Sequence, residues 1–517
     1  MIPLNKVPME IINIAIVVAY LAGMLAFGWW GKSRTKNSSD YLVAGRRLGP
    51  FLYTGTMAAV VLGGASTVGG VGLGYKFGLS GAWLVIAIGI GVLLLSLLFA
   101  PRLQRLKIFT VSQMLTLRYG SKNATNASAI VMLAYTLMLC ATSTGAYATI
   151  FVVLFDWERW LAIAVGGIIV LVYSTIGGMW SITLADQVQF VIKTIGVFAL
   201  MLPFALSAAG GFDGISAGIP ERARESFFSW DGIGAQTIIT YFVVYTLGLL
   251  IGQDIWQRVF TAKTPTVARW GGSTAGVYCV LYGIAGAIIG MSARVALPDI
   301  DIENLGKDVV YAEVAMNLLP VAIGGIVLAA AVAAMMSTAS GALIAAATVA
   351  RNDVTPFVAG WFGKKVEVNT GRNPEHDVAA NRYWVLGLGV VAIVLAIVVD
   401  DVVAALTIAY DILVGGLLVS ILGGLLWKRG NGVGAALSMA AGTIVTLTTM
   451  IVLEIGSDEK FGGVYANEPI YYGLASSLVV YLVVSLLTPA TRPEVSSHWA
   501  DRVSGRVDVE GVPAEQR

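Results

Sequence analysis

The sequence predicts an all-α polytopic membrane protein with about 13 transmembrane helices. Of its 517 residues, 57% are hydrophobic and only 12% are charged, whereas soluble proteins carry about 25% charged residues. Apolar runs long enough to cross a bilayer recur along the chain, and they lack the alternation of a membrane barrel strand. These features exclude a soluble globular enzyme, and a net charge of +2 gives no reason to expect a nucleic-acid partner.

The apolar runs define the expected spans. They lie near residues 9–30, 50–75, 81–101, 125–155, 160–178, 186–207, 232–253, 270–295, 318–349, 383–400, 402–427, 433–455 and 469–488. The first is longer than a signal-peptide core and lacks a small-residue cleavage site, so we interpret it as a retained helix.

Charged loops predict the orientation. The loops after the first, third, seventh and ninth runs are basic, while those after the eighth and tenth are acidic, with Asp299, Asp301 and Glu303 in one and Asp400 and Asp401 in the other. The positive-inside rule then places the N-terminus outside and the C-terminus in the cytoplasm. The polar segment 489–517 mixes both signs, and we expect a disordered cytoplasmic tail there.

Glycines interrupt two of the runs. Residues 63–74 contain six glycines, which indicates either close helix packing or, as we favour, an unwound stretch facing a mid-membrane site. A second interruption is expected at Gly248, Gly252 and Gln253, five runs later. Paired interrupted helices are typical of inverted-repeat secondary transporters.

Hydroxyl groups cluster in the ninth run, at Ser337, Thr338 and Ser340. Such hydroxyls can simply bond back to the preceding helical turn. Together with unwound carbonyls, they also suit a small hard cation. Neither His376 nor His498 lies in an apolar run, and Cys140 and Cys279 lack metal-ligand spacing, so the sequence indicates no catalytic metal centre.

Charges inside the apolar runs need partners or water. Asp186 is the first residue of the sixth run, where its negative charge can interact favourably with the helix dipole. Lys193 lies seven residues later on the same face, so a water-mediated link between the two is expected. Asp411 has no partner that the sequence identifies.

Several segments together resemble the sodium:solute symporter family. These are Asp40–Arg46, Gly64–Ser66, Tyr173–Trp180, Asp186–Gln189, Gln257–Arg258, Met336–Ser340 and Leu426–Arg429. The resemblance implies a five-plus-five inverted-repeat core of the leucine-transporter type, made of helices 2–6 and 7–11. Residues 1–488 would then form one transporter domain, with an extra helix at 9–30, repeats at 50–207 and 232–427, and two trailing helices at 433–488.

The resemblance also implies a sodium site. Its ligands would be the carbonyls of Ala65, Val68 and Ala334 and the hydroxyls of Ser337 and Thr338. Some members bind a second cation at positions matching Asp186, Ser337 and Ser340. The next position of that site is Gly341 here, which departs from the pattern.

The solute positions match no familiar carrier. Thr67 replaces the aspartate of proline carriers, Thr246 and Leu250 replace their aromatic residues, and Gly252 replaces a tryptophan of choline carriers. Elimination leaves a small organic solute such as a monocarboxylate or an amino acid. The candidate solute contacts are Ser66, Thr67, Gly69, Thr142, Tyr245 and Gln253.

The sequence thus predicts a symporter of the cell membrane that imports a small organic solute together with Na+. We expect no enzyme activity, no cofactor other than Na+ as coupling ion, and no nucleic-acid partner; the expected partners are the solute, Na+ and the lipid bilayer. The sequence does not give the oligomeric state. Two alternatives remain open: a proton-coupled permease of the same fold that uses Asp186, and a channel or sensor.

Overall fold

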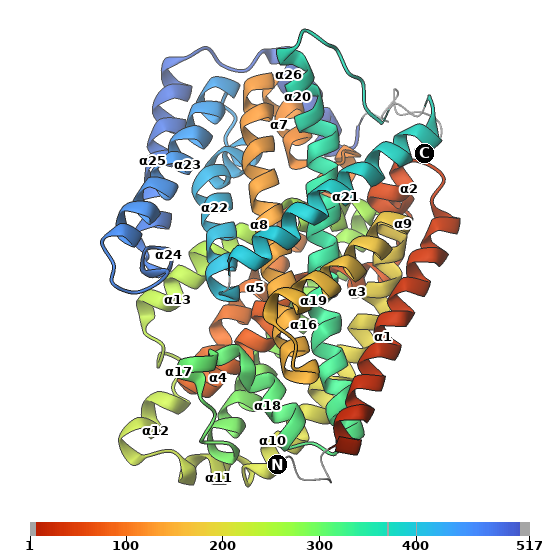
Figure 1. Cartoon of the computed structure of the whole chain (residues 1–517). Coiled ribbons are helices and arrows are strands. Elements are labelled where there is room, and N and C mark those ends of the chain that lie inside the picture. Colours follow the sequence, from red (N-terminus) through yellow and green to blue (C-terminus); the bar gives the residue numbers. More distant parts are fainter. Residues whose placement is uncertain (1–6, 370–371, 400, 507–517) are drawn as a thin grey trace.

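A computed structural model describes residues 7–369, 372–399 and 401–506 (Figure 1). This part of the chain is helical and contains no strand, only an isolated bridge between Leu48 and Ala262. The all-α class is therefore confirmed. Asp400 and residues 507–517, which belong to the predicted acidic loop and tail, lie outside the described residues.

The helices fall into three groups. The long helices of the bundle are α1 (Val7–Arg34), α8 (Lys122–Phe155), α9 (Arg159–Thr194), α16 (Pro265–Ala296), α19 (Val321–Val349), α21 (Pro374–Val398), α22 (Val402–Leu426), α23 (Gly432–Ile455) and α25 (Glu468–Leu487). The segments of interrupted or bent spans are α3 (Pro50–Val61), η2 (Ala65–Gly69), α4 (Gly70–Phe77), α5 (Trp83–Leu94), η4 (Leu95–Phe99), α6 (Ala100–Leu106), η5 (Ile195–Met201), α10 (Leu202–Ala208), α13 (Ala235–Tyr241), η6 (Phe242–Thr246), α14 (Leu247–Leu249) and α15 (Gln253–Thr261). The connecting segments are α2 (Ser38–Val43), η1 (Ala44–Arg46), η3 (Gly78–Ala82), α7 (Val111–Tyr119), α11 (Gly211–Gly218), α12 (Glu221–Phe228), α17 (Ile302–Leu305), η7 (Lys307–Val309), α18 (Val310–Asn317), η8 (Ala350–Val354), α20 (Thr355–Trp361), α24 (Gly462–Tyr465) and α26 (Pro493–Ser504).

Ten described helices are long and apolar enough to cross a membrane, or eleven if the bent pair of residues 235–249 and 253–261 is one span. Two of these long elements contain glycines in left-handed backbone conformations, Gly78 (φ +65°) and Gly178 (φ +56°). At Gly178 two helices join across a kink. If the bent pair is one span and each of these two elements is divided at its glycine, the described helices correspond to the thirteen predicted spans. The number thirteen stays a prediction.

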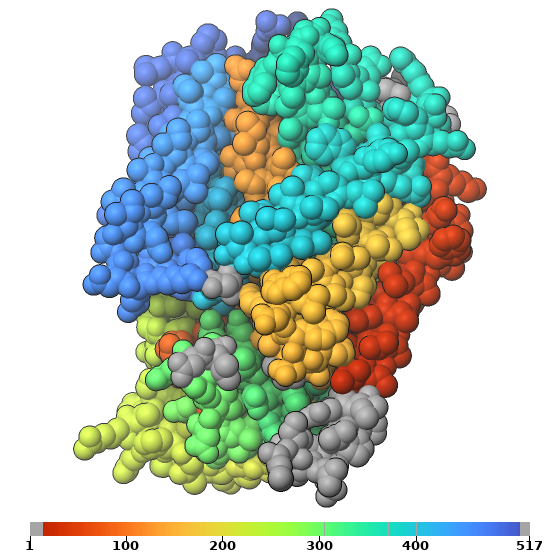
Figure 2. Space-filling view, viewed as in Figure 1, coloured from red at the N-terminus to blue at the C-terminus, as the bar shows by residue number. Residues whose placement is uncertain are grey.

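The first and last spans lie at the sides of the bundle (Figure 1). Helix α1 packs against α9 and α19, and α23 and α25 pack against each other and against α22. Figure 2 shows α21, in cyan, crossing this face next to α9, in gold, with α1 in red beside it. The interrupted helices are therefore enclosed by long helices.

The connecting segments gather at two ends of the bundle. Helices α2, α7, α20 and α26 lie at the upper end of Figure 1, and α11, α12, α17 and α18 lie at the lower end. The described chain starts at the lower end and finishes with α26 at the upper end, as an odd number of crossings requires. That the upper end faces the cytoplasm remains a prediction from the basic loops.

The expectation of a disordered tail is wrong for residues 493–504. They form α26, which packs against α6 and α7. Its side chains Trp499 and Val503 contact the hydrophobic core. The prediction of disorder relied on the mixed charge of the segment and overlooked that it forms an amphipathic helix with one apolar face.

The glycine-rich segment 63–74 is also more regular than expected. Only residues 62–63 leave helical geometry, and the chain is helical again from Gly64 to Phe77. Gly72 and Gly74 instead permit close packing, since a Cβ atom there would lie 2.4 Å from the Lys307 carbonyl oxygen and 2.5 Å from that of Ala287. Packing and unwinding thus each explain part of the glycine cluster.

The close approach of α4 and α16 leads to a stability prediction. At Gly290 a Cβ atom would lie 2.2 Å from the Val71 carbonyl oxygen and 2.5 Å from the Tyr75 amide nitrogen. Because both neighbours are backbone atoms, Gly290→Ala should destabilise the fold by about 1–3 kcal/mol. The matched control is Gly387→Ala on α21, where nothing lies within 4 Å. Melting temperatures in detergent should fall for the first variant and not for the second; equal values would contradict the packing account.

Candidate functional site

The break after α3 leaves its last carbonyl groups without partners inside the helix. Side chains donate hydrogen bonds to the last four carbonyl oxygens of α3. Lys193 Nζ donates to the carbonyl oxygens of Ala58 (3.1 Å) and Ala59 (3.3 Å), Thr338 Oγ1 donates to that of Val60 (2.7 Å), and Ser66 Oγ donates to that of Val61 (3.3 Å). Lys193 thus bonds the end of α3 directly, and the water-mediated link to Asp186 stays a prediction.

The second break lies between α14 and α15, at residues 250–252, where the helix axis bends by 45°. The indole of Trp256 donates to the Leu250 carbonyl oxygen (2.8 Å). A Cβ atom at Gly248 would lie 2.4 Å from the ring of Tyr410, so glycine lets α22 approach the break. This confirms the discontinuity predicted from the second pair of glycines.

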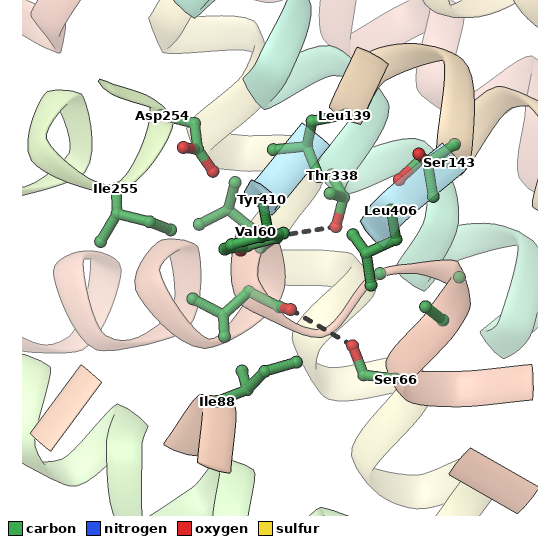
Figure 3. A pocket seen from close by; sticks show the side chains of 15 residues that line it. Val60, Ser66, Ile88, Leu139, Ser143, Asp254, Ile255, Thr338, Leu406 and Tyr410 are labelled. Carbon is green, nitrogen blue, oxygen red and sulfur yellow. Dashed lines mark hydrogen bonds between the residues drawn. The ribbon is translucent and has the colours of Figure 1, made fainter. Parts of the chain in front are cut away.

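A small cavity joins the two breaks (Figure 3). Its lining comes from both interrupted spans and from α5, α8, α19 and α22, namely Val60, Val61, Gly63, Gly64, Ala65, Ser66, Ile88, Leu139, Thr142, Ser143, Asp254, Ile255, Thr338, Leu406 and Tyr410. The cavity has a volume of about 20 Å³, room for one or two water molecules. The spans must therefore separate before an organic solute can enter.

The predicted sodium ligands lie around the first break. Ala65 and Thr338 line the cavity, and Val68 follows Ala65 within the same π-helical turn, η2. Thr338 Oγ1 also lies 3.5 Å from the carbonyl oxygen of Ala334. Ser337 points elsewhere, and its hydroxyl donates to Asp186 Oδ1 (2.6 Å). The structure therefore places the five residues on two adjoining elements, with Ser337 turned toward α9.

Asp186 is the centre of a buried polar cluster. It accepts hydrogen bonds from Thr56 on α3 and Ser337 on α19. Its Oδ2 forms an ion pair with Arg258 Nη2 of α15 at 3.1 Å, and both side chains are fully buried. A Cβ atom at Gly341 would lie 3.0 Å from the same guanidinium nitrogen. Glycine at position 341 thus makes room for the arginine. Ser340, the other predicted member of a second cation site, donates to the Ser337 carbonyl oxygen (3.0 Å).

Of the six candidate solute contacts, two line the cavity and four do not. Ser66 and Thr142 line the cavity. Thr67 and Gly69 face other neighbours, since Thr67 Oγ1 accepts from Tyr282 (3.3 Å) and the Cβ position of Gly69 lies 3.6 Å from Asp308.

The remaining two candidates, Tyr245 and Gln253, pack behind the residues that line the cavity. The Tyr245 ring meets the edge of Tyr410, with 5.3 Å between centroids. The Gln253 amide bonds the Phe109 carbonyl and the Val111 amide, both at the start of α7 or just before it. Neither residue lines this cavity.

Three residues that were not predicted also line the cavity: Ser143, Asp254 and Tyr410. Asp254 directly follows Gly252 and Gln253, so a charge beside a glycine break was the available signal. Tyr410 gave no such signal, because only the fold brings α22 to the break. Asp411, the next residue, is buried, and its Oδ1 has no hydrogen-bond partner in the described part of the chain.

Comparisons with known proteins agree with this architecture. The model of the sodium:solute symporter family matches residues 41–442. The sodium/proline symporter of Escherichia coli K12 is 26% identical over 498 residues, covering 93% of this chain and 94% of that protein. The sodium/proline symporter of Salmonella typhimurium LT2 is 25% identical over 442 residues, covering 83% and 86%.

A solved structure shares the fold. A Na+-coupled sialic acid symporter in its substrate-bound outward-open state superimposes with a TM-score of 0.75 at 18% identity, covering 93% of this chain and 99% of that one. The family match spans most of the sequence and includes both breaks and the residues around them. The chain therefore belongs to the sodium:solute symporter family, and it is a multi-pass membrane protein that couples solute transport to sodium.

Proposed function

We propose that this symporter imports a small organic solute and that its Na+ binds between the first break and α19. The ligands are the carbonyls of Ala65, Val68 and Ala334 and the hydroxyls of Ser337 and Thr338. One observation carries the proposal: Thr338 lines the cavity with Ala65 and is hydrogen-bonded to Val60 at the end of α3. A cation at this point would tie α19 to the interrupted helix.

Both hydroxyl oxygens can accept a cation, with Thr338 on the cavity wall and Ser337 turned toward Asp186 on α9. Each donates its proton to a protein acceptor, Ser337 to Asp186 and Thr338 to Val60. The lone pairs of both oxygens remain available to accept a cation. Neutral carbonyl and hydroxyl oxygens suit a small hard ion such as Na+.

We propose a single sodium ion for each transport cycle. The place of a second ion, beside Asp186, already has a positive charge in Arg258, 3.1 Å away. Gly341 supplies no ligand there, and Val60 and the Arg258 guanidinium lie where its side chain would be. A second cation next to Arg258 would meet like-charge repulsion in a buried site.

Coupling follows from alternating access around the cavity. Sodium would stabilise the outward-open state, in which the solute enters between the two breaks, and closure would then precede inward release. A single charge that moves down about 100 mV supplies roughly 2.3 kcal/mol. This corresponds to roughly fifty-fold accumulation of a neutral solute before any sodium gradient is counted.

The sequence leaves two classes of solute, a monocarboxylate and an amino acid. The relatives that are sodium/proline symporters support the amino acid. Thr67, which replaces the aspartate of proline carriers, accepts a hydrogen bond from Tyr282 and does not line the cavity.

The sodium site can be tested by removing its hydroxyls. We expect Ser337→Ala combined with Thr338→Ala to abolish Na+-stimulated uptake in proteoliposomes, because two of five ligands are lost. The matched control is Thr274→Ala on α16, an exposed hydroxyl that bonds only its own helix. Sodium stimulation that survives unchanged in the double variant would show that the ion binds elsewhere.

The ion pair of Asp186 separates sodium coupling from proton coupling. Because Arg258 is its partner, we expect Asp186 to serve as a structural anion. Wild-type uptake should follow a Na+ gradient at constant pH and ignore a pH gradient without Na+. Asp186→Asn leaves Arg258 buried and unpaired and should destabilise the fold by about 3–5 kcal/mol, measured as a lower melting temperature. Uptake driven by a pH gradient alone, and lost in Asp186→Asn without a change in melting temperature, would favour the proton-coupled alternative.

A further inference from the structure

The charge of the cavity indicates the class of solute. Of the 15 described residues that line it, Asp254 alone has a charged side chain. Figure 3 shows the Asp254 carboxylate directed toward the centre of the cavity, opposite the first break. The described cavity wall thus contains one acidic side chain and no basic one.

Asp254 has no cationic partner within the described residues, where no Lys, Arg or His forms an ion pair with it. Arg258, one turn along the same helix, is paired with Asp186 instead. Asp254 accepts a side-chain hydrogen bond from the hydroxyl of Tyr135, which lies 2.9 Å from Oδ1. Asp186 and Asp254 are both buried, but among the residues that the structure describes only Asp186 forms an ion pair.

Tyrosine side chains lie next to this carboxylate: Tyr135 is hydrogen-bonded to it, Tyr410 lines the same cavity, and Tyr245 packs behind Tyr410. The Tyr135 and Tyr410 rings meet edge to face with centroids 5.6 Å apart, and Tyr245 meets Tyr410 at 5.3 Å. A Cβ atom at Gly252 would lie 2.9 Å from Asp254 Oδ1 and 3.0 Å from the Tyr135 hydroxyl. Glycine at the second break therefore leaves space for this group. A carboxylate beside aromatic rings is the combination that recognises ammonium groups.

We propose that the transported solute has a positively charged nitrogen, as an amine, a quaternary ammonium compound or a zwitterion, and that Asp254 binds this nitrogen. The inference rests on the proposed function, since it assumes that the solute binds in the cavity between the breaks. A simple monocarboxylate would place its anion against Asp254 with no fixed cation in the cavity wall to offset the repulsion. Of the two classes reached by elimination, this favours the amino acid.

Pairs of compounds that share a shape but differ in charge test the proposal. Suitable pairs are choline with 3,3-dimethylbutanol, glycine betaine with 3,3-dimethylbutanoate, and L-proline with cyclopentanecarboxylate, extended to other amines and amino acids, sugars and carboxylates. Thermal stabilisation of the full-length protein in Na+, followed by uptake into proteoliposomes, measures binding and transport. We expect only compounds with a charged nitrogen to bind, and their carbon analogues to fail.

Two variants connect the result to Asp254. Asp254→Asn keeps the shape but removes the charge, and it should weaken binding of the nitrogen compounds by about tenfold or more. Tyr135→Phe removes only the hydrogen bond, and it should keep the preference for charged nitrogen at lower affinity. Melting temperatures without solute show whether each variant is folded.

The outcomes separate this inference from the proposed function. Na+-dependent uptake of a carboxylate or sugar, with no response to any nitrogen compound, would overturn the inference and leave sodium symport intact. An unchanged preference for nitrogen in a folded Asp254→Asn variant would equally exclude Asp254 as its cause. A wild-type protein that shows no Na+-stimulated uptake of any compound would contradict both.

Discussion

The structure depends on hydrogen bonds to the free carbonyl groups at the end of α3, where the helix breaks inside the membrane. A helix that stops in hydrocarbon exposes carbonyl groups that water cannot solvate. Here Lys193, Thr338 and Ser66 bond the last four carbonyls of α3. Gly63 is required because a Cβ atom there would lie 2.6 Å from Thr338 Oγ1. The break is therefore held by α9 and α19, the helices through which an ion can influence it.

The buried charges follow the same requirement. Lys193 supplies positive charge at the C-terminal end of α3, where the helix dipole favours it. Asp186 and Arg258 neutralise one another and connect α9 to α15, while Thr56 and Ser337 extend this cluster to α3 and α19. Both interrupted spans are thus linked to the helices that flank them. Asp254 differs because its carboxylate faces the cavity, where we propose that the solute binds.

Sequence patterns predicted the parts of this arrangement that depend on local composition. Apolar runs predicted the spans, and glycines near 63 and 252 predicted both breaks. The packing role of Gly72 and Gly74 and the helix α26 depend on long-range contacts, which a single sequence does not reveal. The partners of Lys193 and the position of Tyr410 were missed for the same reason, because residues more than 130 positions apart meet only in the fold.

The proposed sodium site combines Thr338 with the break after α3. Equilibrium binding of radioactive Na+ to the purified protein tests it without knowledge of the solute. We expect saturable binding of one ion per wild-type chain, retained in Thr274→Ala and absent in a folded Thr338→Ala variant. Wild-type binding retained in Thr338→Ala would contradict the account.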